Sequence, residues 1–176
     1  IVDADRQGSS FRWATLRPDN VPGVLAFEGG RRSLQKLPPD TGQLLIDTPA
    51  GARERELEPY LDQANVLLVP VLPSSFDLDA TLAFVDELQS INRIHRGKLP
   101  VALVANRLKP WTHASQDAIA QLAEQSPFPI VAQLRDSQAY VLLTSLGKGI
   151  FDYHSEQVRS HQEDWKPLLR WIKRQA

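Results

Sequence analysis

The feature that most constrains the fold of this chain is the alternation of short apolar runs with longer amphipathic stretches. The apolar runs are mostly continuous, which is the pattern of strands covered on both faces. The longer stretches place apolar residues three or four positions apart, as amphipathic helices do. This alternation predicts an α/β fold with a doubly wound, mainly parallel sheet flanked by helices. The predicted strands are residues 1–3, 24–27, 43–47, 65–71, 101–105 and 129–133, and the predicted helices cover about 53–63, 78–96, 114–125, 137–146 and 156–175.

The helical periodicity is clearest over residues 78–96. Its apolar stripe consists of Leu82, Val85, Leu88, Ile91 and Ile94. Asp77 or Asp79 is expected to cap the first turn, because a side-chain oxygen there accepts from backbone N–H groups that lack a partner within the helix. Gly97 follows the end of the stripe, where glycine is common.

The composition is that of a folded protein, with 42% hydrophobic and 23% charged residues among 176. This length suits a single domain over residues 1–176. The formal net charge of −1 means that nucleic-acid binding would need a local basic patch. The absence of cysteine excludes disulfides, thiolate zinc sites, iron–sulfur clusters and cysteine nucleophiles within these residues, and it fits a reducing, cytoplasmic location. No apolar run reaches the roughly 20 residues of a membrane span.

Polar side chains follow the predicted strands at their carboxyl ends, where ligands bind in sheets of this kind. Asp3 lies at the end of the first strand with Asp5 just beyond it, and Asp47 ends the third strand. Asp47 is followed by the turn Thr48-Pro49-Ala50-Gly51, and the fifth strand runs into Asn106-Arg107. Three carboxylates, a glycine turn and an asparagine are therefore expected at one edge of the sheet.

These groups suit a nucleotide bound with magnesium. Mg²⁺ keeps several waters and is bound through one or two carboxylates together with substrate phosphates. Asp47 would point at a metal-bound water, the Pro-Ala-Gly turn after it could offer a backbone N–H to a terminal phosphate, and Asp5 could orient an attacking water. The side-chain amide of Asn106 can pair with an adenine edge. Each group also has an ordinary interpretation as a cap, a turn residue or a solvated carboxylate, but their order and spacing together favour the site.

The same segments resemble the ParA/MinD family of deviant Walker ATPases, which position DNA segments, plasmids, division sites or protein cargo. The family's switch I segment, which a tryptophan follows, is similar to VDADRQGSSFRWA, where Trp13 is that tryptophan. Its Walker B and switch II segments resemble LLIDTPAG, and the strand and loop after them resemble LLVPVLPSSFDLDAT. The strand with the adenine-reading asparagine is similar to VALVANRLKP, and a late segment resembles LRDSQAYVLLTSLGKGIFDY.

The resemblance implies a P-loop NTPase-like fold of the SIMIBI type, with ATP and Mg²⁺ as cofactors and weak intrinsic ATP hydrolysis. It implies that Asp5 helps to activate the hydrolytic water and that Asp3 and Asp47 hold magnesium through water. The implied cofactor-binding residues are Gly51, as the γ-phosphate sensor, Asn106, at adenine, and their neighbours Pro49 and Arg107.

The family also implies partners. These are a second copy in an ATP-dependent homodimer, a ParB-like or cargo-adaptor protein that stimulates hydrolysis, and nonspecific DNA, as in chromosome and plasmid partition at the nucleoid. Contacts to DNA phosphates are blind to sequence and sensitive to salt. The candidate DNA-binding residues are Arg135, Lys148 and Arg159.

The chain departs from the family pattern in two places. Arg6 stands where the family usually has proline. The 176 residues also contain no glycine-rich phosphate loop with its lysines and threonine. The resemblance places that loop, with the first strand and a helix, upstream of Ile1. The alternative is a ParA-like interaction module that does not hydrolyse ATP.

Other functions remain as alternatives. The last predicted helix combines tryptophans with basic residues, so it could lie on a membrane surface as the tail of the MinD branch does, although packing on the sheet is the stronger expectation. A metabolic enzyme of the wider superfamily is a further alternative. Its iron–sulfur branch is disfavoured by the absence of cysteine, and no G-x-G-x-x-G follows a strand to indicate a dinucleotide oxidoreductase.

Overall fold

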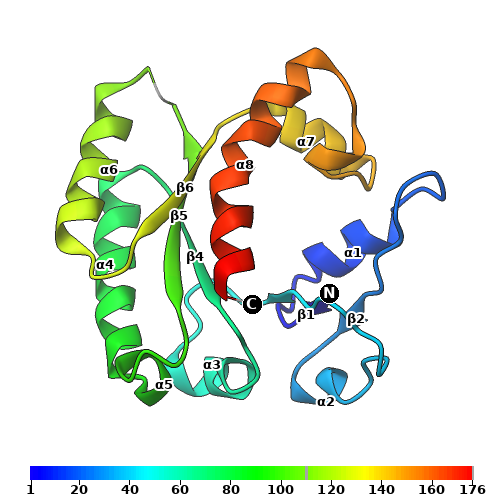
Figure 1. Cartoon of the computed structure of the whole chain (residues 1–176), viewed down its shortest axis with the longest axis horizontal. Helices are drawn as coiled ribbons and strands as arrows, with labels where there is room; N and C mark the ends of the chain where they lie inside the picture. Colours follow the sequence, from blue (N-terminus) through cyan, green and yellow to red (C-terminus); the bar gives the residue numbers. More distant parts are fainter. Residues whose placement is uncertain (110, 176) are drawn as a thin grey trace. The chain divides into compact units, whose positions relative to one another are not determined.

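The computed structural model describes residues 1–109 and 111–175. The chain divides into two compact units, each made of two segments, and each unit contains one three-stranded sheet (Figure 1). The first unit is Ile1–Tyr60 with Gln138–His154, and the second is Leu61–Ser137 with Ser155–Ala176. All strand pairs in both sheets are parallel. The predicted α/β class is therefore confirmed, while the single domain over 1–176 stays a prediction.

The sheet of the first unit has the order β2-β1-β3. Its strands are β1 (Val2–Asp3), β2 (Phe27–Glu28) and β3 (Ile46–Asp47), and its helices are α1 (Ser9–Thr15), α2 (Arg31–Leu34), α3 (Glu54–Leu61), α7 (Gln138–Ser145) and the 3₁₀ helix η1 (Ile150–Asp152). These strands are shorter than predicted. Leu25 and Leu45 lie before the paired residues and are 66% and 58% exposed, so the apolar runs extend beyond the ladder.

The sheet of the second unit has the order β4-β5-β6. Its strands are β4 (Leu67–Val71), β5 (Val101–Leu108) and β6 (Ile130–Arg135), and its helices are α4 (Ser75–Ser90), α5 (Asn92–His95), α6 (His113–Gln125) and α8 (Glu156–Gln175). In Figure 1, α8 covers one face of this sheet while α4 and α6 lie on the other. The central strand β5 is buried throughout residues 101–105, as its continuous apolar run predicts.

Helix α4 begins earlier than the sequence predicts, and the predicted caps Asp77 and Asp79 are wrong. Ser74 is the N-cap, with its Oγ accepting from the backbone N–H of Asp77 at 3.2 Å. Asp77 occupies the third helical position instead, where its carboxylate accepts from the Ser74 hydroxyl. The helix ends at Ser90 because Ile91 takes an extended backbone (φ −68°, ψ 120°), and Gly97 follows the short α5 with φ 65°.

Helix α8 packs on the sheet, as the sequence analysis expects. Leu168 is buried in a cluster with Val104, Ala132 and Leu134. Trp165 and Ile172 pack against the same cluster. No helix in the described part of the chain is long and apolar enough to cross a membrane.

Candidate functional site

The carboxylates predicted from the first and third strands lie side by side. Asp3 on β1 is in register with Asp47 on β3, and on its other side with Glu28 on β2. Neighbouring strands lie about 4.8 Å apart, so the three residues end one edge of the first unit's sheet together. Glu28 was not predicted. Its signal in the sequence is its position as the first charged residue after an apolar run, the same signal that identified Asp47.

Asp3 is buried, with 2% of its surface exposed, and both of its carboxylate oxygens accept from the backbone. Its Oδ1 accepts from the N–H of Asp5 at 3.1 Å, and its Oδ2 accepts from the N–H of Phe11 at 2.8 Å. Hydrogen bonds to an ionised carboxylate are stronger than those between neutral groups. Asp3 therefore ties the loop after β1 to the first turn of α1.

Asp5 and Asp47 are half-buried and keep one oxygen each for a ligand. Asp5 Oδ1 accepts from the N–H of Gln7 at 3.0 Å, and Asp47 Oδ2 accepts from the hydroxyl of Ser10. Within residues 1–109 and 111–175, no hydrogen bond to Asp5 Oδ2 or Asp47 Oδ1 is found. These two atoms can accept from water. Ser10 was not predicted, because a hydroxyl in a loop pattern carries no signal of its partner.

The turn after β3 is Pro49-Ala50-Gly51. Its backbone closes with the N–H of Ala52 donating to the Pro49 carbonyl at 3.2 Å. Gly51 is exposed and has φ 69°, a conformation that side-chain-bearing residues rarely adopt. A Cβ at Gly51 would meet nothing within 4 Å, so the backbone conformation, not space, requires glycine.

Asn106 and Arg107 lie in an irregularity of the second unit's sheet. The pairing of β5 with β6 shifts register between Ala105 and Leu108, and Arg107 has φ 53°. The Arg107 N–H donates to Asn106 Oδ1 at 2.9 Å. Bulges of this kind occur next to functional sites, where they redirect a side chain. The structure thus turns Asn106 out of the regular ladder, and its amide nitrogen donates to no other described residue.

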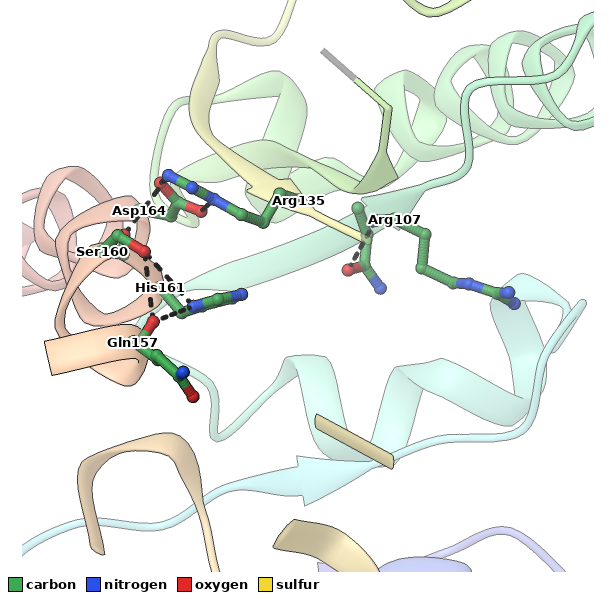
Figure 2. A network of polar contacts seen from close by, with 7 residues as sticks. Arg107, Arg135, Gln157, Ser160, His161 and Asp164 are labelled. Carbon is green, nitrogen blue, oxygen red and sulfur yellow. Dashed lines mark hydrogen bonds and ion pairs between the residues drawn. The ribbon is translucent and has the colours of Figure 1, made fainter. Parts of the chain in front are cut away.

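The three candidate DNA-binding residues have different surroundings. Arg135 reaches from β6 to α8 (Figure 2) and binds Asp164 with both Nε and Nη2, at 2.6 and 2.7 Å. The Asp164 carboxylate therefore neutralises the Arg135 charge to which a DNA phosphate would bind. Arg159 is exposed in the second unit, and Lys148 is half-buried in the first. All three stay predictions as DNA contacts.

The donor set fits magnesium held through water more than direct coordination. Among the described residues, no group of three or more histidines, aspartates or glutamates is placed to hold a metal ion. Within the described residues, Asp47 and Asp5 each have one carboxylate oxygen without a hydrogen bond, whereas both oxygens of Asp3 accept from backbone N–H groups. Mg²⁺ bound by few carboxylates and several waters matches this arrangement.

Parallel sheets flanked by helices, with carboxylates at the strand ends, define an α/β protein. The solved structure of the MinC:MinD cell division protein complex of Aquifex aeolicus contains a chain that matches 98% of this one and 82% of its own length, with a TM-score of 0.68. The identity is 15%, so this likeness establishes the fold.

Two sequence relatives are more specific. Both are named maintenance of carboxysome distribution protein A. The protein from Gloeobacter kilaueensis is 26% identical over 181 residues, which cover 99% of this chain and 80% of that protein. The protein from Halothiobacillus neapolitanus is 28% identical over 130 residues, which cover 69% of this chain and 60% of that protein. No protein-family model matches the chain. The chain is therefore similar in sequence to these two distribution proteins and in fold to a chain of the MinC:MinD complex.

Proposed function

We propose that this chain is a ParA/MinD-like ATPase that positions a cellular cargo by cycling between nucleotide states. The observation that carries the proposal is the pair Asp3 and Asp47, in register at the carboxyl ends of adjacent parallel strands, with Asp5 in the loop that follows. The relatives are named for carboxysome distribution. A protein assembly is therefore the class of cargo that we propose, rather than a plasmid or chromosome.

Each site residue has one role in the proposal. Asp5 orients the attacking water through its unoccupied Oδ2, while Asp3 holds the loop that carries it. Asp47 holds magnesium through water, and Asp3 lies in register beside it on the adjacent strand. When bound, Mg²⁺ neutralises charge on the phosphates. In the first unit, the proposal assigns the γ-phosphate to the Gly51 N–H, with Pro49 beside it. In the second unit, Asn106 is the candidate for adenine, with Arg107 beside it.

The phosphate loop is the part of the site that the 176 residues do not contain. The experiments below use the natural gene product. In the proposal this product forms an ATP-dependent homodimer in the cytoplasm. A cargo-adaptor or ParB-like partner stimulates its weak hydrolysis, and nonspecific DNA of the nucleoid serves as the surface on which it moves.

Substitution of Asp5 tests the proposal. Asp5→Ala should bind ATP with little change but lose partner-stimulated turnover by about 100-fold, the usual scale for a general acid–base residue. ATP binding is measured by calorimetry and turnover by phosphate release. Asp19→Ala, which removes an exposed carboxylate of the same unit, is the matched control. Unchanged hydrolysis in Asp5→Ala would remove Asp5 from its role, and a wild-type protein that binds no ATP would overturn the function itself.

A further inference from the structure

The carboxyl end of α1 is docked on the turn that follows α7. Gly147 in this turn has φ 65°, and a Cβ built on it would lie 2.3 Å from the carbonyl oxygen of Leu16 and 2.7 Å from the backbone nitrogen of Arg17. Two backbones can approach so closely only where one of them carries no side chain. The contact joins residues 130 positions apart within the first unit.

The guanidinium of Arg17 stabilises this contact through hydrogen bonds. Nη1 and Nη2 donate to the two carboxylate oxygens of Asp152, at 2.9 and 3.1 Å. Nη1 also donates to the carbonyl of Gly147 at 3.3 Å, and Nε to the carbonyl of Pro22 at 2.9 Å. The Arg17 side chain is only 7% exposed. A planar guanidinium bound at so many points fixes orientation as well as distance.

Trp13 completes the arrangement. The guanidinium carbon of Arg17 lies 4.8 Å from the centre of the Trp13 ring, in cation–π contact. Trp13 Nε1 donates to the Lys148 carbonyl at 3.2 Å. Asp152 also accepts from the Gly149 N–H at 2.7 Å. We call Trp13, Arg17, Gly147 and Asp152 the Arg17 clamp.

The other end of α1 is held by the candidate site. Phe11 donates its N–H to Asp3, and Ser10 donates its hydroxyl to Asp47. Helix α1 has seven residues, a length of about 10 Å at 1.5 Å per residue. Residues 4–8, which include Asp5, therefore connect β1 to a short helix that is held at both ends.

We propose that the Arg17 clamp is a positioning device: it holds α1 so that the loop bearing Asp5 keeps one geometry at the candidate site. Its role in hydrolysis rests on the proposed function. Hydrogen bonds at the amino end alone would let so short a helix pivot. A buried ion pair contributes little net stability compared with apolar packing. We therefore assign to the Arg17–Asp152 pair a role in orienting α1.

Hydrogen exchange tests the clamp without any activity measurement. In Asp152→Asn and Arg17→Lys, the amides of residues 5–11 should exchange about 10-fold faster or more, because local opening exposes them. Arg93→Lys is the matched control. Arg93 likewise donates to two backbone carbonyls, those of Leu61 and Ala64, but in the second unit. Unchanged exchange at residues 5–11 in both clamp variants would overturn the proposal.

Kinetics of the natural gene product separate positioning from stability. The clamp variants should lower kcat for ATP about 10-fold while KM stays within about twofold, since a small displacement of a catalytic group slows the chemical step. If Arg93→Lys, at matched melting temperature, lowered kcat equally, the effect of the clamp variants would come from lost stability alone. That result would overturn the positioning role. A wild-type protein without ATP hydrolysis would instead overturn the proposed function. The hydrogen-exchange data would still show whether the Arg17 clamp holds residues 5–11 in place.

Discussion

At the scale of single residues, the carboxylates of the candidate site differ in their hydrogen-bond partners. Asp3 is buried and committed to two backbone N–H groups, whereas Asp47 accepts from one side-chain hydroxyl and keeps a free oxygen. The first arrangement holds a loop in place. The second orients a carboxylate that can still accept from water.

Removal of the Ser10 hydroxyl tests this orientation. Ser10→Ala should lower kcat for ATP by about fivefold, because the lost hydrogen bond contributes about 1 kcal/mol to holding Asp47. Ser9→Ala is the neighbouring control, as Ser9 is exposed and its hydroxyl accepts from Arg12 Nη2 at 3.4 Å. Hydrolysis rates of the two variants at saturating magnesium give the comparison. Equal rates in both would show that Ser10 does not act through Asp47.

Asp152 makes a second prediction, about pH. The hydrogen bond from Arg17 lowers the pKa of the Asp152 carboxyl below its ordinary value of 3.8, with smaller lowering from the Gly149 N–H and from the charges of Arg17 and Lys148 and an opposing effect of burial. A lowered folded-state pKa means that the pair stabilises the fold fully above the unfolded-state pKa, and that this contribution is lost as pH falls through the folded-state pKa.

The stability difference between wild type and Asp152→Asn should therefore be largest near neutral pH and shrink below about pH 4. At neutral pH, Asp152→Asn leaves the buried guanidinium without its counter-charge, at a cost of about 3 kcal/mol. Urea unfolding at pH 7, 4 and 3 measures the difference. A gap that stays constant over this range would mean that the carboxylate charge is not what matters.

At the scale of elements, α8 is attached to the second unit by one face. Leu168 is 4% exposed in the cluster with β5 and β6, while its neighbour Leu169 is 47% exposed. The two leucines share a helix, a side-chain volume and a helix propensity, so they differ only in what they pack against. The face that carries Leu168, Trp165 and Ile172 packs on the sheet, which accounts for the apolar residues of this amphipathic helix.

This pair gives a matched comparison of packing. Leu168→Ala should lower the free energy of unfolding by about 3 kcal/mol, because it leaves a cavity in the cluster. Leu169→Ala should change it by about 0.5 kcal/mol or less, as expected for a surface site. Chemical unfolding followed by circular dichroism measures both. Similar losses in the two variants would contradict the assignment of the buried face.

At the scale of the whole molecule, charge limits what the protein can bind. The net charge is −1, and Arg135, one of the three candidate DNA contacts, is already paired with Asp164. We propose contacts to two or three phosphates, with Lys148 and Arg159 among the candidates. The proposed contact with DNA is therefore weak and easily reversed by salt.

The salt dependence of DNA binding tests this estimate. Affinity for a nonspecific duplex should fall roughly 10- to 40-fold between 50 and 200 mM salt, as expected for two to three phosphate contacts. The double variant Lys148→Ala with Arg159→Ala should bind more weakly and show a shallower slope. Fluorescence anisotropy measures both quantities. An unchanged slope in the double variant would assign the contacts to other residues.

Local pattern determined most of the elements. The positions of the six predicted strands match β1–β6, because continuous apolar runs bounded by polar residues favour strands. Two-sided cover holds for the central strand β5, whereas the strands of the first unit pair over only two residues each. The placement of Asp3 and Asp47 at one sheet edge followed, since the parallel strands of one sheet bring their carboxyl ends together, whereas Asn106 belongs to the other sheet. Helix α1 was not predicted because it has only seven residues and no apolar stripe, and the α4 cap was misplaced because several nearby residues could serve as the N-cap.

By itself, the sequence determined the fold class, the strands and the positions of the acidic residues at their ends, because these depend on near neighbours in the chain. Only the tertiary structure decided which partner each side chain has. Ser10 meets Asp47, Arg17 meets Asp152, and Gly147 meets Leu16 across 37 to 135 positions of sequence. Such pairings depend on how elements pack in three dimensions. The local pattern of residues does not indicate which distant side chains that packing brings together.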